Sequence, residues 1–154
     1  MKLLVVCLGN ICRSPLAEGA LRERIARSPL AGRIQVDSAG TGDWHAGQPP
    51  DPRAIACARN HGVDISDLRA RQLRRSDFDD FDWLLCADRQ NLRDVLAQAP
   101  AHCRGKVGLL LEWAGMEPGG AIPDPYSGGS KDFEHAWRLV DSAAQAVVAR
   151  LCAG

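Results

Sequence analysis

Short apolar runs alternate with segments of helical periodicity along the chain, and this alternation constrains the fold more than any other feature. The first run, residues 3–8, is continuous and rich in Leu and Val, which is typical of a strand buried on both faces. Further strands are expected at residues 34–38, 81–86 and 107–111. Helices are expected at residues 14–27, 51–61, 89–98 and 132–151. The pattern predicts a doubly wound α/β sheet of about four parallel strands.

The length of 154 residues is typical of one compact domain, because a chain of this size can bury a core without metal or disulfide support. We therefore expect a single domain over residues 1–154, and we expect it to be a monomer. Nineteen basic residues balance nineteen acidic ones, so no overall field would attract nucleic acid or an anionic membrane. A run of arginines followed by aspartates is interpreted as a solvated mixed-charge face without function. The run comprises Arg69, Arg71, Arg74, Arg75, Asp77, Asp79, Asp80 and Asp82.

The six cysteines form no C-x-x-C pair and have no nearby histidine pattern, which argues against a disulfide scaffold and against a zinc site. Reduced thiols in a cytosol fit better, so a cytoplasmic protein without a metal is expected. The apolar run after Met1 and Lys2 has six residues, fewer than the roughly seven to fifteen of a signal-peptide core. Later apolar stretches are shorter than a membrane-spanning helix.

The loop between the first strand and the first helix, residues 7–13, is predicted to bind an anion. In a parallel sheet, ligands bind beyond the carboxyl ends of the strands, and the backbone N–H groups around Gly9 can converge at the helix N-terminus. Arg13 adds a planar fork that can hold two oxygens of a tetrahedral oxyanion. A nucleotide-binding P-loop is excluded, because there is no G-x-x-x-x-G-K-[ST] motif. The expected ligand is a phosphoryl group.

A thiol stands in this loop, and its position predicts nucleophilic catalysis. The N–H groups, the helix dipole and Arg13 that would hold a phosphate also stabilise the thiolate form of Cys7. The alternative is an inert core thiol at a strand end and a surface arginine. The combined C-x5-R-S spacing, with a strand before it and a helix after it, favours catalysis.

A general acid is expected in the loop that precedes the last helix. Hydrolysis of a phosphate monoester is very slow unless the leaving oxygen is protonated, and Asp124 is the best candidate. Pro123 and Pro125 keep its backbone extended, and the glycine-rich loop of residues 115–130 could close over a site. The Pro-Asp-Pro pattern by itself favours a surface aspartate in a turn, and only the cysteine loop and the resemblance described below favour a general acid.

The segment CLGNICRSPLAE at residues 7–18 resembles the signature of the low-molecular-weight protein tyrosine phosphatases. The likeness continues through SAGTGDWHAG (38–47), DPRA (51–54), ARQL (70–73), DRQNLR (88–93) and DPY (124–126). It implies a flavodoxin-like three-layer sandwich, with a four-stranded parallel sheet and helices on both faces. It also implies that Cys7 is the nucleophile, Arg13 the phosphate-binding residue and Asp124 the general acid, without metal or cofactor.

The resemblance implies further roles in the loop. Asn10 would hold the backbone shape with help from Ser38, and Ser14 would donate a hydrogen bond to the Cys7 thiolate. The residues expected to surround phosphate or substrate are Leu8, Gly9, Asn10, Ile11, Cys12, Ser14, Trp44 and Tyr126. Two positions depart from many bacterial members: Leu68 stands where a histidine supports Asn10, and Ser127 where a second aromatic follows Asp-Pro.

The expected substrates are phosphotyrosine-containing proteins and aryl phosphates, with inorganic phosphate as product. Trp44 and Tyr126 could flank an aryl ring, although simple packing explains Trp44 equally well, and His45 is interpreted as structural. A phosphoarginine phosphatase is an alternative. The related phosphoarginine enzymes carry a threonine in the loop where this chain has Ile11, so Ile11 favours phosphotyrosine.

Two further alternatives concern the thiols. An arsenate reductase of the same fold would need two more cysteines close together on a mobile segment, but Cys86 and Cys103 are seventeen residues apart. Cys12 could trap an oxidised Cys7 as a regulatory disulfide or could simply pack. A phosphoprotein-binding module without chemistry is disfavoured, because nucleophile, cation and acid are all present.

Overall fold

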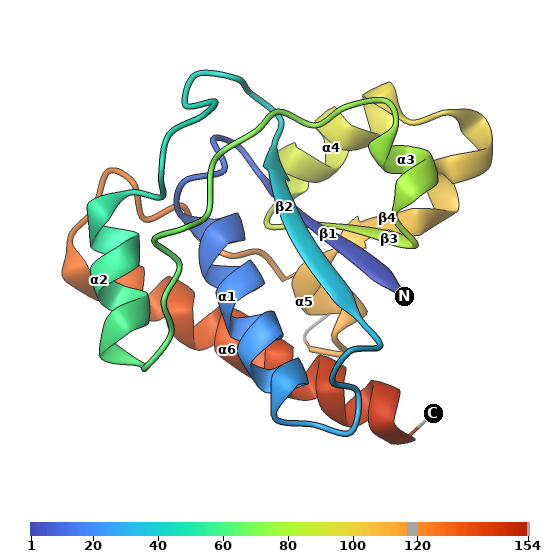
Figure 1. Ribbon diagram of the computed structural model, residues 1–154. Coiled ribbons are helices and arrows are strands. Elements are labelled where there is room, and N and C mark those ends of the chain that lie inside the picture. The colour runs from blue at the N-terminus through green and yellow to red at the C-terminus, as the bar shows by residue number, and fades with distance from the viewer. Residues whose placement is uncertain (117–119, 154) are drawn as a thin grey trace.

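The computed structural model describes residues 1–116 and 120–153 and contains a four-stranded parallel sheet in the order β2-β1-β3-β4 (Figure 1). The strands are β1 (Lys2–Cys7), β2 (Gln35–Gly40), β3 (Trp83–Cys86) and β4 (Val107–Leu109). The chain moves from β1 to one neighbour, β2, and later to the other, β3. The strand order therefore reverses at β1, and ligands bind at such a switch point in open α/β sheets.

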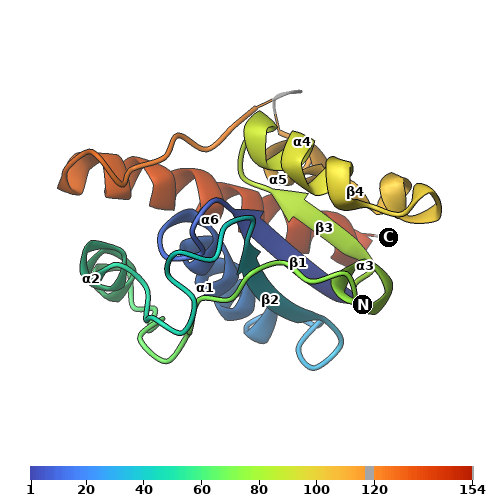
Figure 2. The same cartoon turned by 90° about the horizontal axis from the view of Figure 1, so that it is seen from above.

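Helices cover both faces of the sheet and complete the flavodoxin-like sandwich. On one face α1 (Arg13–Ala26) and α6 (Ser130–Ala153) lie side by side, and α2 (Pro52–Asn60) packs on α6 (Figures 1 and 2). The short α5 (Leu110–Trp113) belongs to the same side. The other face carries α3 (Asp77–Asp80), the 3-10 turn at Ala101–Lys106 and α4 (Arg89–Gln98).

The two faces of β1 explain why its sequence is continuously apolar. Val5 and Cys7 belong to the core cluster under α1 and α6, whereas Leu4 and Val6 belong to the cluster under α3 and α4. Alternate side chains of a strand point to opposite faces. In a strand that is covered on both faces every side chain is therefore buried, and the sequence is apolar throughout. The predicted fold class is confirmed.

Several sequence-based boundaries differ from the structure; the third strand, for example, begins at Trp83 instead of residue 81. The apolar run at residues 107–111 contains only a three-residue strand, and its last part begins α5, because a short apolar run does not distinguish strand from helix. The second strand continues to Gly40 instead of ending at residue 38. Residues 117–119 of the predicted glycine-rich loop lie outside the described residues.

The interpretation of the arginine–aspartate run as a solvated face is wrong for two of its members. The Asp77 carboxylate is fully buried and accepts two hydrogen bonds from the Arg71 guanidinium, at 2.9 and 3.1 Å. Arg71 also donates to Asp37 at 3.1 Å. A buried carboxylate requires such pairing, and composition alone gives no sign of which aspartate turns inward.

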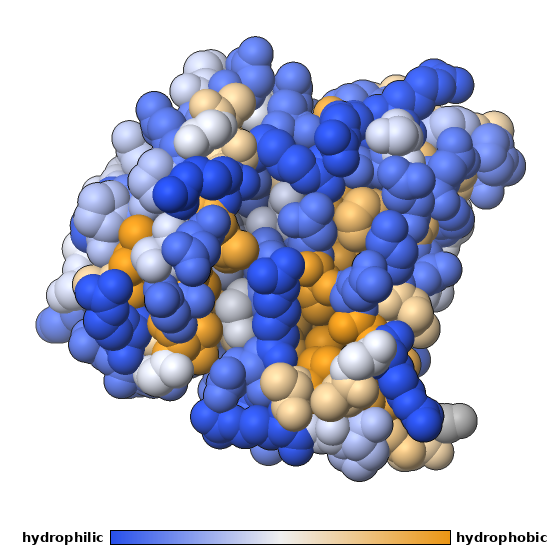
Figure 3. Space-filling view, viewed as in Figure 1, coloured by the Kyte–Doolittle hydropathy of each residue, from blue (hydrophilic) through white to orange (hydrophobic). Residues whose placement is uncertain are grey.

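Polar and charged side chains cover most of the surface in Figure 3, with apolar side chains visible in smaller areas between them. Within residues 1–116 and 120–153, no helix combines the length and the apolar content that a bilayer crossing requires.

Candidate active site

The loop after β1 forms the floor of a pocket of about 150 Å³. Cys7 comes from the end of β1, Arg13 from the start of α1, and Asp124 from the segment before α6. The structure therefore brings together three residues that are far apart in the sequence. The pocket is lined by Cys7, Leu8, Gly9, Ile11, Cys12, Arg13, Trp44, His45, Asp124 and Tyr126.

The loop backbone is free to bind an anion. Within the described part of the chain, the N–H groups of residues 9–13 donate to no protein acceptor, although residues 10–13 are buried. These donors lie at the N-terminus of α1, where the helix dipole favours negative charge. Two close approaches shape the loop. A Cβ atom on Gly40 would lie 2.8 Å from the Leu8 carbonyl oxygen, and one on Gly9 would lie 3.0 Å from the His45 ring.

Asn10, Ser14 and Ser38 lie behind the pocket and form a directed hydrogen-bond chain. The Asn10 side-chain amide donates to Ser14 Oγ at 2.8 Å and to Ser38 Oγ at 2.9 Å. Its Oδ1 accepts the backbone N–H of Arg71 at 3.0 Å, which determines the orientation of the amide. Because both serine oxygens accept from Asn10, the Ser14 hydroxyl proton is available to Cys7 Sγ, 3.0 Å away. A charge-assisted bond of this kind stabilises a thiolate.

The same chain ends at a buried carboxylate that the sequence analysis missed. Ser38 donates to Glu18 Oε1 at 2.6 Å, and the second carboxylate oxygen lies 2.6 Å from Arg22 Nη2. This ion pair lacks the alignment of a hydrogen bond, so among the described residues the buried Oε2 has an ionic partner but no hydrogen-bond donor. Burial raises the pKa of Glu18, although the bond from Ser38 and the charge of Arg22 oppose the shift. The spacing of Glu18 within α1 gives no signal of its role.

Asn10 also depends on its backbone. Its φ of 57° lies in the left-handed region, which asparagine tolerates better than most residues. Leu68 stands where a histidine would support Asn10 in many bacterial members. Here the support comes from the Arg71 N–H, and the Arg71 side chain is tied to Asp37 and Asp77.

Arg13 is held rigidly. Its side chain is 3% exposed, and Nη1 donates to Asp88 Oδ2 at 2.6 Å and to the Ile122 carbonyl at 2.9 Å. Burial alone would lower the pKa of Arg13, but Cys7 and Asp88 outweigh it and raise that pKa. Asp88 is also the N-cap of α4 and forms a capping box with Asn91. Asp88, the first residue of the sequence segment DRQNLR, therefore both caps α4 and orients Arg13. The sequence pattern did not reveal this second role.

Asp124 faces Arg13 from across the pocket. Its Oδ2 lies 3.7 Å from Arg13 Nη2, and its side chain is 44% exposed. Arg53, which the sequence analysis also missed, holds the same segment by donating to the carbonyls of Tyr126 and Gly128 at 2.9 and 3.1 Å. Asp51 pairs with Arg53 at 3.0 Å, so the start of α2 positions the segment that carries Asp124.

Aromatic side chains form the upper wall of the pocket. Trp44 is 66% exposed and Tyr126 49% exposed, and the ring centroids of His45 and Tyr126 are 6.3 Å apart. His45, interpreted from the sequence as structural, also lines the pocket. An open aromatic rim above a small polar floor matches a ligand with an aryl ring and an anionic end.

Comparison with known proteins agrees with this geometry. Residues 2–153 match the family model described as low molecular weight phosphotyrosine protein phosphatase. The low molecular weight phosphotyrosine protein phosphatase of Sus scrofa is 40% identical over 137 residues, covering 88% of this chain and 85% of that protein. Its namesake from Schizosaccharomyces pombe is 41% identical over 143 residues, covering 92% and 91%.

Two crystal structures extend the similarity to three dimensions. A protein tyrosine phosphatase from Entamoeba histolytica with Hepes in its active site superposes with a TM-score of 0.93 at 34% identity, covering 100% of this chain and 98% of that chain. YfkJ from Bacillus subtilis gives a TM-score of 0.91 at 33% identity, covering 99% and 95%. The chain thus belongs to the low molecular weight phosphotyrosine protein phosphatase family.

Proposed function

We propose that this protein tyrosine phosphatase hydrolyses phosphotyrosine in proteins in two steps, through a phosphoryl group carried on Cys7. The observation that carries the proposal is the convergence of Cys7, Arg13 and Asp124 on one small pocket. We treat residues 1–154 as one catalytic domain that needs neither a metal nor a cofactor for this chemistry.

In the first step, the Cys7 thiolate attacks phosphorus in line with the bond to the phenolic oxygen. The N–H groups of residues 9–13 and the Arg13 guanidinium hold the three equatorial oxygens, where charge is spread in the transition state. Asp124 donates its proton to the leaving oxygen. The S–P bond forms, the P–O bond breaks, and tyrosine leaves as the neutral phenol.

In the second step, water attacks the phosphorus of the cysteinyl-phosphate. Asp124, now a carboxylate, takes a proton from the water, the S–P bond breaks, and inorganic phosphate forms. The departing Cys7 thiolate is stabilised by the hydrogen bond from Ser14, 3.0 Å away. The exposure of Asp124 supports this role, because the same carboxylate must reach both a phenol and a water molecule.

The aromatic rim supports phosphotyrosine as the substrate class. Trp44 and Tyr126 can contact the aryl ring, and the buried Ile11 presents an apolar side chain to the pocket. Phosphotyrosine-containing proteins are the proposed partners, in a signalling role. The arsenate reductase alternative is not favoured, because Cys86 and Cys103 are fully buried in the core between β3 and α4 and cannot form a mobile relay.

Cellular context and regulation extend the proposal. We infer a cytoplasmic monomer that binds neither nucleic acid nor membrane.

An oxidant such as hydrogen peroxide would convert Cys7 to a sulfenic acid, and the Cys12 thiol would displace water from it to give a disulfide. Burial, and then the charge of Asp51, raise the pKa of Cys12 above its usual range, so Cys12 is a thiol in the resting protein, and its proton leaves with the sulfenic oxygen as water when the disulfide forms. A mass loss of two hydrogens after peroxide treatment, absent in Cys12→Ser, tests this point.

The direct test of function is hydrolysis of p-nitrophenyl phosphate and of a phosphotyrosine peptide in excess EDTA. Cys7→Ser is expected to abolish turnover, and Asp124→Ala to lower kcat by about 10²-fold or more. Full activity of Cys7→Ser, or a requirement for added metal, would contradict the mechanism. Arsenate-dependent consumption of a thiol reductant would point to the reductase instead.

A further inference from the structure

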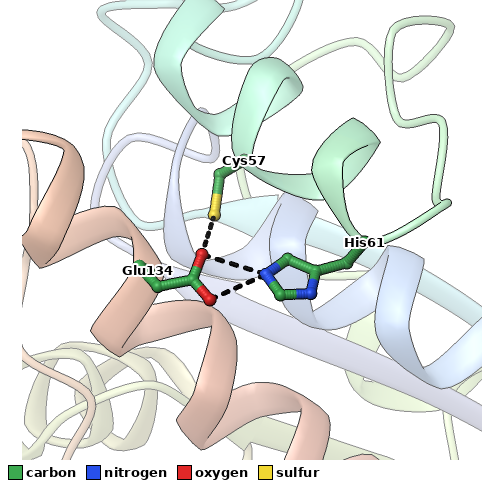
Figure 4. A group of neighbouring side chains, drawn as sticks. All are labelled: Cys57, His61 and Glu134. Carbon is green, nitrogen blue, oxygen red and sulfur yellow. Dashed lines mark hydrogen bonds and ion pairs between the residues drawn. The ribbon is translucent and has the colours of Figure 1, made fainter.

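A second group of reactive side chains lies between α2 and α6 and shares no residue with the active-site pocket. Cys57 lies on α2, His61 is the C-cap residue of that helix one turn later, and Glu134 faces them from α6 (Figure 4). The Cys57 thiol lies 3.6 Å from Glu134 Oε2, and His61 Nε2 lies 2.8 and 2.9 Å from the two carboxylate oxygens. One sulfur, one nitrogen and one carboxylate oxygen therefore lie within 4.8 Å of one another.

Two of the three separations are close to those of a tetrahedral metal centre, and the third, between Cys57 Sγ and His61 Nε2, is no more than 4.8 Å. Zinc bonds of about 2.0–2.3 Å place neighbouring ligand atoms about 3.3–3.6 Å apart. The sulfur–oxygen separation of 3.6 Å already has this value. The imidazole needs to withdraw from the carboxylate by only about 0.5 Å, since its present separation is that of a hydrogen bond, 2.8 Å.

The surroundings hold the three side chains in place and leave access from solvent. The His61 ring stacks on Trp137, with centroids 5.0 Å apart and planes inclined by 14°. Cys57 and Glu134 also line an open pocket of about 450 Å³, through which an ion and a water ligand could enter. Arg138 lies 3.7 Å from Glu134 and is 74% exposed, so it can turn to solvent when a cation binds.

We propose that Cys57, His61 and Glu134 bind a Zn²⁺-class ion, with water as the fourth ligand, and that this ion links α2 to α6. A thiolate and an imidazole select zinc or cobalt over magnesium or calcium. Glu134 supplies a carboxylate oxygen that already lies 2.8 Å from His61 Nε2. Binding releases the Cys57 thiol proton to solvent, because the thiolate is the form that binds a metal. In the metal-free protein His61 Nε2 donates its proton to Glu134, so binding of the ion through Nε2 moves the ring proton to Nδ1.

The sequence analysis argued against a zinc site, because the cysteines form no C-x-x-C pair and no histidine pattern was recognised near them. The C-x3-H spacing of Cys57 and His61 places both side chains on one face of a helix, but their carboxylate partner comes 73 residues after His61. Asp79, His102 and Cys103 form a second group within the same distance limits. Asp79 and His102 are both about three-quarters exposed, so this group lacks comparable support and provides a matched control.

The test is a Co²⁺ titration of the full chain carrying Cys7→Ser, which removes the active-site thiolate as a competing ligand. We expect one equivalent of Co²⁺ to give the visible bands of tetrahedral cobalt and a near-ultraviolet thiolate charge-transfer band, and Zn²⁺ to displace it. His61→Ala and the nearly isosteric Glu134→Gln should each weaken binding at least about 10-fold. His102→Ala should leave the affinity unchanged.

A thermal melt gives an independent reading. Free Zn²⁺ at 100 times its measured Kd should raise the Tm by about 5–10 °C, and the rise should disappear in Glu134→Gln. Absence of a thiolate band would overturn the proposal. So would an unchanged titration in His61→Ala, or a loss of binding in His102→Ala. Circular dichroism of the metal-free variants confirms that each one is folded.

Discussion

Replacing Asn10 tests whether the loop shape depends on a strained backbone, on the side-chain amide, or on both. In Asn10→Ala the part-buried Arg71 N–H, which in the wild-type protein donates to Oδ1 at 3.0 Å, loses its acceptor. An unpaired buried donor costs about 1–3 kcal/mol. The alanine must also adopt φ near 57°, which costs about 1–2 kcal/mol. The expected loss in unfolding free energy is therefore about 2–5 kcal/mol.

Asn10→Gly is the matched control, because glycine adopts the left-handed conformation freely but also lacks the amide. It should lose about 1–3 kcal/mol from the unpaired N–H. Glycine also gives the unfolded chain about 0.4–1 kcal/mol of extra entropy, so its net advantage over Asn10→Ala is about 0.8 kcal/mol at the midpoints of the two ranges. Urea denaturation of the three proteins, read by tryptophan fluorescence, measures these differences.

Activity gives the second reading of the same variants. Without the Asn10 amide, Ser14 is no longer forced to point its hydroxyl proton at Cys7, so both variants should lower kcat about tenfold or more, equivalent to about 1.4 kcal/mol. Equal stability of the alanine and glycine variants would refute the argument from backbone strain. Stability and kcat both close to wild type would refute the role of the hydrogen-bond chain.

Three further substitutions test separate parts of the account. Arg13→Lys should lower kcat/KM on p-nitrophenyl phosphate by about 10²–10³-fold, because a single ammonium cannot pair with Asp88 and also hold two phosphate oxygens; a loss below about tenfold would contradict this. Arg71→Met should destabilise the fold by about 3–5 kcal/mol, because the buried Asp77 carboxylate loses its close cationic partner and keeps only the Arg74 backbone N–H and the more distant Arg74 guanidinium. The exposed Arg74→Met should cost less than about 1 kcal/mol. Glu18 tests the pH dependence. Burial raises its folded-state pKa above 4.5, so the folded state binds the proton more tightly. Wild-type stability should therefore fall, relative to Glu18→Gln, as pH rises from about 4.5 through the folded pKa; denaturation curves between pH 4 and 8 that keep a constant difference would argue against this.

The sequence predicted the parts of this molecule whose chemistry is local. The apolar run of β1, the adjoining loop and the start of α1 are contiguous, so their order and the C-x5-R spacing are visible in the printed chain. The burial of β1 on both faces follows from the same apolar run. The flanking prolines allowed Asp124 to be proposed as the general acid from the sequence. Only the fold, however, brings its carboxylate to within 3.7 Å of Arg13.

The sequence did not predict the residues that act through contacts between distant segments. Asp88, Arg53 and Glu18 each look like ordinary surface positions of a helix start or a helix turn. Their partners lie 75, 73 and 20 residues away, and no periodicity reports such pairings. The buried Asp77 was misread for the same reason, since a run of like residues gives no sign of which one faces the core.

The central claim is that Cys7 carries the phosphoryl group between the two steps, and its most direct test is intact-protein mass spectrometry of an acid-quenched reaction with an aryl phosphate. The mechanism predicts an added mass of one phosphoryl group, mapped to Cys7, and absent in Cys7→Ser. Because Ser14 stabilises the departing thiolate, Ser14→Ala should increase the fraction of protein that carries the adduct. A turnover-competent protein with no adduct, or an adduct located on a histidine, would contradict the account.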